Sequence, residues 1–221
     1  MSEKAKELIK DHYTFDDLVN ILRLLRSPDG CPWDRAQTHE SIRKNLIEEC
    51  YEAVEGIDQK DTHLLCEELG DLLLQIIFHA QMSDEQGEFN MDDVINGVCQ
   101  KMVQRHPHVF GDIRADSPES ALGRWEEMKK REKQDDTPIK AMNRVARTLP
   151  SLMRTQKLIK KAAKAGLEDK GTPTSTEDLI ARYLALCADA NASGIDLEEA
   201  AYAANEAYII EKEKVYNRED R

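Results

Sequence analysis

The fold is decided by residues 45–81, which read NLIEECYEAVEGIDQKDTHLLCEELGDLLLQIIFHAQ. Their apolar periodicity predicts two helices joined by a short polar turn at residues 58–62. Glu49 and Glu52 lie three positions apart on the first helix, and Glu68 and Asp71 have the same spacing on the second. Because side chains at i and i+3 share a helix face, two antiparallel helices can bring these four carboxylates together.

The second helix carries an unusual polar stripe. Residues 64–80 are apolar nearly all round, which predicts a buried helix. The main polar exceptions follow spacings of three, four and four: Glu68, Asp71, Gln75 and His79. Buried carboxylates are costly unless a cation neutralises them, and carboxylate-only ligands suit a hard cation. We therefore expect Mg²⁺ at this site, with Mn²⁺ as its substitute.

The first helix allows two interpretations. We expect its core face to consist of Leu46, Cys50, Ala53, Val54 and Ile57. Its acidic residues would then either hold the cation with the second helix or form an ordinary solvated face. Glu48, Glu52 and Glu55 lie opposite the core face, and Glu49 lies on the flank nearest to it.

Composition favours an all-α protein. Long stretches rich in Leu, Ile, Ala, Glu and Lys dominate the 221 residues, and Pro and Gly are sparse. The net charge of −12 argues against binding to a nucleic-acid duplex, because phosphate contacts need a basic face. Local phosphate binding through metal ions and a few basic side chains is still compatible with this charge.

Cysteine usage and hydropathy predict a cytoplasmic protein. The five cysteines include no CxxC pair, and Cys50, Cys66, Cys99 and Cys187 are interpreted as small core residues in a reducing compartment. The N-terminus lacks the apolar region of a signal peptide, and no apolar run is long enough to span a bilayer. We expect no membrane association.

The rest of the chain predicts further helices around this hairpin. A helix over residues 15–25 is followed by CPWDRAQTH at residues 31–39, where Trp33 either caps the core or contacts a nucleotide base near the acidic site. A helix over residues 94–105 carries Lys101 and Arg105 one turn apart, and a helix over residues 120–133 carries Trp125. We place a first domain at residues 12–136 and a second helical region at residues 141–221.

The second region contains a weak internal repeat. Residues 177–212 repeat the apolar pattern of residues 70–105, with a turn that is one residue shorter, but no EExxE helix precedes them. The ExxD position is reduced to Ser175 and Asp178, and the positions of Lys101 and Arg105 are taken by Ala207 and Glu211. We therefore expect this region to be catalytically silent and to serve structure, through the formation of a homodimer.

These motifs resemble the MazG family of nucleoside triphosphate pyrophosphohydrolases. The family pattern is EExxE followed by ExxD, which here reads EECYE at residues 48–52, fifteen residues, and ELGD at residues 68–71. The flanking segments CPWD and QTH, RHPHVF, RWEEMKK and LPSLMRTQK are also similar to this family's. The resemblance is strong over residues 15–166 and weak beyond them.

The resemblance implies an all-α fold with a four-helix catalytic bundle, homo-oligomerisation, and Mg²⁺-dependent hydrolysis of nucleoside triphosphates to monophosphate and pyrophosphate. Glu49, Glu52, Glu68 and Asp71 match the family's metal ligands. The positions expected to meet the substrate are Lys101 and Arg105 for the triphosphate and Trp125 for the base. Asn45 falls where some relatives carry a phosphate-binding lysine, and Lys44 is its candidate substitute.

Two questions are left open by the residues. Glu48 and Glu49 are both within a turn of the cluster, so either could be the general base. The competing functional hypotheses are a pyrophosphatase restricted to one nucleotide, such as dUTP or dCTP, and a non-catalytic helical module whose acidic face binds a basic partner. The second hypothesis does not explain two carboxylates inside an apolar run.

Overall fold

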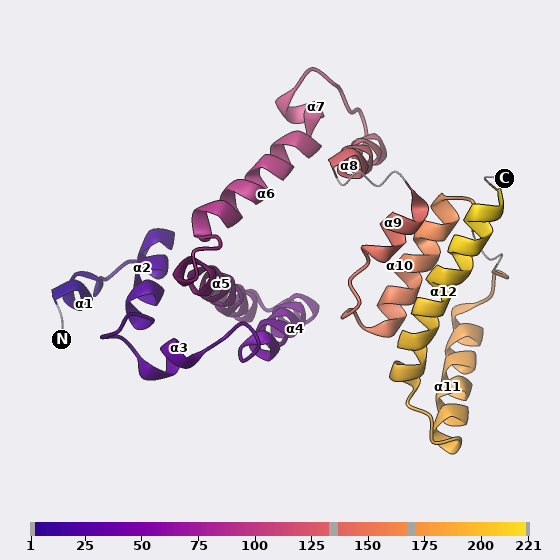
Figure 1. The fold of residues 1–221 in the computed structure, drawn as a ribbon, viewed down its shortest axis with the longest axis horizontal. Helices are drawn as coiled ribbons and strands as arrows, with labels where there is room; N and C mark the ends of the chain where they lie inside the picture. The colour runs from indigo at the N-terminus through magenta and orange to yellow at the C-terminus, as the bar shows by residue number, and fades with distance from the viewer. Residues whose placement is uncertain (1–2, 133–136, 168–170, 220–221) are drawn as a thin grey trace. The chain divides into compact units, whose positions relative to one another are not determined.

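The computed structural model describes residues 3–132, 137–167 and 171–219, and within these ranges it contains helices and no strand (Figure 1). The predicted all-α class is therefore confirmed. Contacts divide the chain into two compact units, Met1–Ile113 and Arg114–Arg221. The helix that carries Trp125 clusters with the second unit, whereas the sequence placed the division after residue 136. None of the described helices is both long and apolar enough to cross a membrane.

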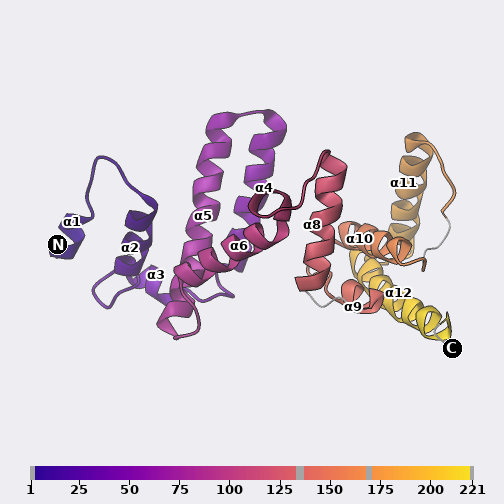
Figure 2. The same ribbon diagram turned by 90° about the horizontal axis from the view of Figure 1, so that it is seen from above.

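The first unit is built around a helical hairpin, visible in Figure 2 as two adjacent helices, α4 and α5. Its helices are α1 (Glu3–Glu7), α2 (Phe15–Leu25), α3 (Pro32–Ala36), α4 (Arg43–Gln59), α5 (Thr62–Glu85), α6 (Met91–Arg105) and α7 (Pro107–Phe110). The helices α2, α4 and α6 all contact α5, so α5 is the common partner of this unit. Its long apolar sequence is what allows one helix to contact three others.

The turn between α4 and α5 follows from local chemistry. Lys60 adopts the left-handed conformation, with φ of 57°, and ends α4. The Asp61 carboxylate then accepts hydrogen bonds from the backbone N–H groups of His63 (2.9 Å) and Leu64 (3.1 Å), which caps α5. Gly56 lies so close to α5 that a Cβ there would approach the Leu65 nitrogen to 2.9 Å. This close approach holds the two acidic faces together.

The core of the first unit lies beside the C-terminal half of α5. It consists of Leu22, Ile42, Ile77, Phe78 and Met82. The carboxylate pair of α5 lies in its N-terminal half, away from this cluster. Packing and polar chemistry are therefore separated along one helix.

Two predictions about burial are wrong for the single chain. On α4 only Ala53 of the expected core face is buried, whereas Val54 and Ile57 are 49% and 58% exposed. On α5, Leu69 is 51% exposed, so this helix is not buried all round. The reason is that α4 is covered mainly by α5, which leaves its other face at the surface. The cysteines also differ from expectation: Cys50, Cys66 and Cys99 are exposed and Cys187 is half-buried.

The second unit has its own core. Its helices are α8 (Pro118–Glu132), α9 (Pro138–Asn143), α10 (Ser151–Lys164), α11 (Thr176–Ala192) and α12 (Leu197–Glu219). The core residues come mainly from α9, α10 and α12: Ile139, Met142, Val145, Leu158, Ala162, Leu167 and Ile209. By contrast, α11 exposes most of its apolar side chains, including Leu179 and Leu184.

Candidate carboxylate cation site

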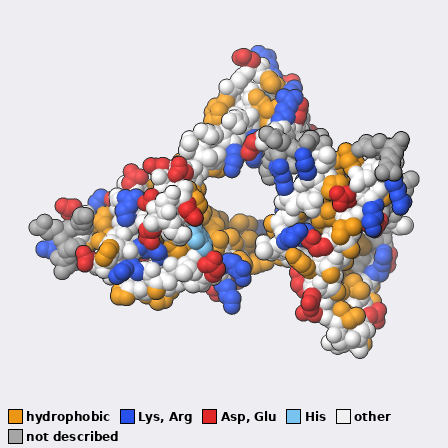
Figure 3. Space-filling model, in the orientation of Figure 1, with side chains coloured by type: hydrophobic (Ala, Val, Ile, Leu, Met, Phe, Trp, Pro, Cys, Tyr) orange, Lys and Arg blue, Asp and Glu red, His pale blue; other side chains and the backbone are white. Residues whose placement is uncertain are grey.

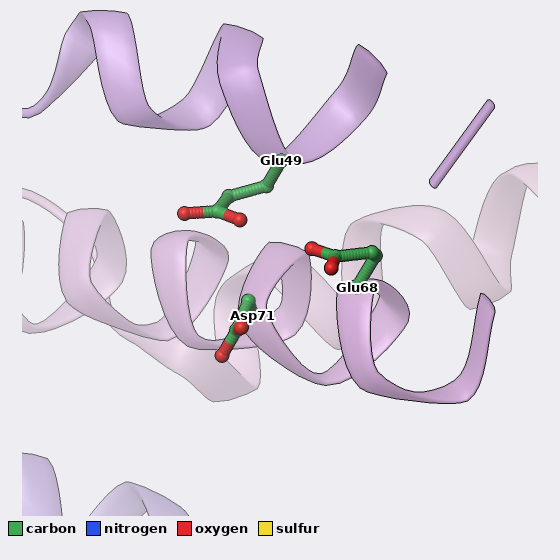
Figure 4. A group of neighbouring side chains, drawn as sticks. All are labelled: Glu49, Glu68 and Asp71. Atoms are coloured by element: carbon green, nitrogen blue, oxygen red, sulfur yellow. The ribbon is translucent and has the colours of Figure 1, made fainter. Parts of the chain in front are cut away.

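Three carboxylates meet where α4 lies against α5. Glu49 comes from α4, and Glu68 and Asp71 come from successive turns of α5 (Figure 4). Each offers one oxygen, and these oxygens all lie within 4.8 Å of one another. The predicted spacing of three on α5 and the antiparallel hairpin together produce this convergence.

Glu52 is the fourth member of the group. Its carboxyl lies close enough to those of Glu49 and Glu68 to raise the pKa of both. It lies one turn after Glu49 on α4, and it is half-buried. The structure thus brings together all four carboxylates that the sequence assigned to the metal.

The pKa values in this group are shifted as expected for crowded acids. Burial raises the pKa of Glu49 above its ordinary value, and the charges of Asp71, Glu52 and Glu68 raise it further. The pKa of Glu68 is also raised, first by burial and then by Glu52, Asp71 and Glu67. A positive charge placed among these groups would offset both the cost of burying their negative charges and the repulsion between them.

The donor set fits a hard divalent cation. Within the described residues, none of the four carboxylates forms an ion pair with Lys or Arg. Oxygens on opposite sides of Mg²⁺ are about 4.2 Å apart, since each bond is about 2.1 Å long. Oxygens within 4.8 Å therefore need only small side-chain rotations to share one ion. Glu68 is 8% exposed, which makes an uncompensated charge there costly.

The other predicted residues of the first unit fall on α4 and α6, outside the carboxylate group. Glu48 is exposed on α4 about one turn before Glu52, and Lys44 is exposed about two turns before it. On α6, Lys101 is exposed and Arg105 is buried. Their roles toward phosphate and toward the attacking water stay predictions.

The two tryptophans fall in different units. Trp33 lies on α3 in the first unit and is 61% exposed. Trp125 lies on α8 in the second unit, where the Lys129 Nζ is 4.6 Å from the centre of its ring. Exposure of Trp33 is compatible with a contact to a ligand, and the base-stacking role of Trp125 stays a prediction.

One contact near the site was not predicted from the sequence. The His39 Nδ1 lies 2.7 Å from the His79 Nδ1, and the two rings are nearly parallel, with an interplanar angle of 11°. His79 was recognised as part of the polar stripe, but its partner is forty residues away in the chain. No local pattern in the sequence pairs residues at that separation.

The fold and the site define an all-α protein with a group of crowded carboxylates on a helical hairpin. Residues 37–110 match the family model of the MazG nucleotide pyrophosphohydrolase domain. The chain is 44% identical over 156 residues to the nucleoside triphosphate pyrophosphohydrolase/pyrophosphatase MazG of Thermotoga maritima, covering 71% of this chain and 59% of that protein. The chain belongs to the MazG family.

Two further relatives show how far the similarity extends. The nucleoside triphosphate pyrophosphohydrolase of Escherichia coli K12 is 41% identical over 154 residues, 69% of this chain and 59% of that protein. The uncharacterized protein YabN of Bacillus subtilis is 47% identical over 149 residues, 67% of this chain and 30% of that protein. The chain therefore spans about a third to three fifths of the length of these relatives.

Proposed function

We propose that this protein hydrolyses nucleoside triphosphates, canonical or aberrant, to a nucleoside monophosphate and pyrophosphate, with Mg²⁺ or Mn²⁺ bound by Glu49, Glu52, Glu68 and Asp71. The observation that carries the proposal is the convergence of carboxylates from α4 and α5, with three oxygens within 4.8 Å and no ion pair to Lys or Arg among the described residues. The family model and the names of the Thermotoga and Escherichia relatives support the same reaction.

The chain's own residues have distinct tasks in this reaction. When bound, Mg²⁺ would supply charge neutralisation at the phosphate oxygens and a lowered pKa of the attacking water. Lys101 and Arg105 lie one turn apart on α6 and would stabilise the negative charge of the leaving pyrophosphate. Glu48 or Glu49 would take the proton of the attacking water. Lys44, near the start of α4, would meet the phosphate chain.

The test is a panel of ribo- and deoxynucleoside triphosphates assayed with Mg²⁺, with pyrophosphate and orthophosphate measured separately. We expect pyrophosphate alone, and loss of turnover when a chelator removes the metal. Glu68→Gln should lower turnover by at least about 100-fold, because it removes a ligand charge from the metal. Measuring each nucleotide also decides whether one base, such as that of dUTP or dCTP, is preferred.

The chain offers matched controls on both helices. Glu67→Gln alters an acid of α5 that lies outside the carboxylate group, with its side chain 62% exposed. Glu55→Gln does the same on α4. Both should retain activity near that of the parent. Orthophosphate as the main product, or turnover that a chelator does not change, would contradict the proposal and favour the helical interaction module.

We also propose that the protein is a homodimer. Two exposed apolar surfaces support this, and Figure 3 shows apolar side chains at the surface of both units. On α4 the exposed residues are Ile47, Tyr51, Val54 and Ile57, and on α11 they are Leu179, Ile180, Tyr183, Leu184 and Leu186. Burying such surfaces against a second copy would restore the core faces that the sequence predicts.

Light scattering tests the dimer and distinguishes the two surfaces. Val54→Asp would disrupt association through α4, and Leu184→Asp would disrupt association through the C-terminal unit. The sequence assigned dimerisation to residues 141–221, so Leu184→Asp is the variant expected to dissociate. A monomeric parent protein at all concentrations would contradict the dimer.

A further inference from the structure

The loop of residues 31–39, which includes the short helix α3 and Trp33, is fixed to α5 at one end by a pair of histidines. His39, two residues after Gln37, contacts His79 through their Nδ1 atoms at 2.7 Å. In this geometry one ring must donate and the other must accept, so at least one imidazole is neutral. Burial and the neighbouring His39 lower the pKa of His79, which favours the neutral ring that the contact needs.

A buried arginine fixes the same loop at its middle. The Arg26 side chain is 6% exposed, and its Nε and Nη2 each donate to the Glu85 carboxylate on α5 at 2.8 Å. Its Nη1 donates to the carbonyl oxygens of Asp34 and Gln37. The guanidinium also lies 5.4 Å from the centre of the Phe78 ring. One side chain thus ties the end of α2, the loop and α5 together.

The loop is also held internally, while its tryptophan is exposed. The Gln37 Nε2 donates to the Trp33 carbonyl at 2.9 Å, and the Arg35 Nη1 donates to the Pro28 carbonyl at 2.9 Å. Gly30 is required here, since a Cβ would lie 2.2 Å from the carbonyl oxygens of Leu24 and Leu25. Trp33 is nevertheless 61% exposed. A rigid loop with an exposed indole is the arrangement expected when that indole meets a ligand.

The histidine contact that attaches the loop lies about two turns of α5 away from the carboxylate group. His79 and Asp71 lie on the same stripe of α5, eight residues apart, which is about 12 Å at a rise of 1.5 Å per residue. A nucleoside triphosphate that is held by its phosphates at Asp71 and extends along α5 toward His79 would place its nucleoside at this distance. In that orientation the loop is attached beside the base.

We propose that His39 and Arg26 are positioning residues for substrate recognition: they fix residues 31–39 to α5 so that the Trp33 ring forms a stacking face for the nucleoside. This inference rests on the proposed function. It predicts that the two residues affect nucleotide affinity through Trp33, while the carboxylate site and the hydrolytic step stay intact.

The first arm of the test measures the loop without substrate. Trp33 and Trp125 are the two tryptophans of the chain, so Trp125→Phe leaves Trp33 as the fluorescent reporter. In this background, His39→Ala should add a fast component to the decay of Trp33 anisotropy, because the loop is released from α5. His39→Asn should largely reverse this, since its amide can reach the position of the Nδ1. Unchanged anisotropy with His39→Ala would overturn the anchoring.

The second arm measures recognition in the otherwise native chain. His39→Ala and Arg26→Met should raise KM for a nucleoside triphosphate by about tenfold, a factor within the range found for loss of base stacking, and should change kcat little. The Ki of inorganic triphosphate, which has no nucleoside, should be unchanged. His39→Asn should recover most of the KM. His63→Ala, at a side chain that is 93% exposed on the same helix, is the control.

The outcomes separate this inference from the proposed function. If the parent protein releases no pyrophosphate, the proposed function fails, and the positioning role fails with it even if the anisotropy shows an anchored loop. If the parent is active but His39→Ala lowers kcat with KM unchanged, or raises the Ki of inorganic triphosphate equally, His39 does not act through the nucleoside. A KM that rises with His39→Ala but not with Trp33→Ala would also overturn the inference.

Discussion

Two charged groups, one in each unit, bury charge in opposite ways. In the first unit, Glu49 and Glu68 share a site with two more acids and no Lys or Arg ion pair among the described residues. In the second, the Nη2 of the buried Arg154 lies 2.7 Å from the Glu206 carboxylate, and Arg147 lies 3.4 Å from the same carboxylate. Like charges are concentrated in the first group and opposite charges are paired in the second.

This difference separates a binding site from a structural contact. The Arg154–Glu206 pair joins α10 to α12, beside hydrogen bonds from Ser151 to Glu198 and from Thr155 to Asn205. Its opposite charges lie together without a bound ion. The carboxylates of α4 and α5 repel one another, which lowers the stability of the hairpin and would be offset by a bound cation.

The largest effect should come from neutralising the first unit. We expect the combined variant Glu49→Gln, Glu52→Gln, Glu68→Gln and Asp71→Asn to show no pyrophosphate release above background, because one carboxylate at Asp178 cannot assemble a cation site. In the second unit, Ser175 caps α11 by accepting a hydrogen bond from the Asp178 N–H at 3.1 Å. Residual release by this variant, with circular dichroism showing it folded, would mean that the C-terminal repeat is catalytic.

The second unit should respond in stability instead. Arg154→Met should lower the free energy of unfolding by about 3 kcal/mol, because it leaves the Glu206 carboxylate without its closest partner. Arg131→Met is the matched control, since Arg131 pairs with Glu127 at the surface and such pairs contribute about 0.5 kcal/mol or less. Urea denaturation measures both. If both variants lowered the free energy of unfolding equally, the buried Arg154–Glu206 pair would contribute no more to stability than a surface pair.

A smaller effect is expected at the phosphate-binding positions. Lys101→Ala makes the first copy resemble the second, which has Ala207 at this position. We expect kcat/KM for triphosphates to fall about tenfold, as for loss of one charge-assisted contact, with Mg²⁺ affinity of the free protein nearly unchanged. Calorimetry of Mg²⁺ binding is the check, and a lost metal isotherm in a folded variant would assign Lys101 to the wrong role.

The smallest effect concerns pH and the metal-free protein. The pKa values of Glu49 and Glu68 are raised from 4.5, so the folded state binds protons more tightly than the unfolded state. Their contribution to stability is fully present below about pH 4.5 and is lost as pH rises through the raised pKa values. With a chelator present, Glu68→Gln should therefore become more stable relative to the parent as pH increases.

Added Mg²⁺ should reverse this trend, because the ion binds the ionised carboxylates of the parent and stabilises its folded state. Thermal unfolding at several pH values, with chelator and with Mg²⁺, follows both effects. If the chelated parent gained stability relative to Glu68→Gln with rising pH, the crowding of these carboxylates would not be what limits its stability.

Much of this protein can be predicted from local sequence. The limits of α2, the capping residues Asp61 and Asn90, and the turn between α4 and α5 follow from patterns within a few residues. The carboxylate group is also local in origin, because a spacing of three on each helix and one short turn bring its members together. These features depend on helix periodicity and capping, which neighbouring residues determine.

Only the tertiary structure decided which surfaces are covered and which distant residues meet. The sequence shows that Val54 and Ile57 are apolar, but not that α4 would leave them exposed in the single chain. It shows His39 in a loop and His79 on a helix, but not that their rings lie together. Periodicity shows which side of a helix is apolar, but it does not show which helix covers that side. That depends on how helices far apart in the chain pack against one another.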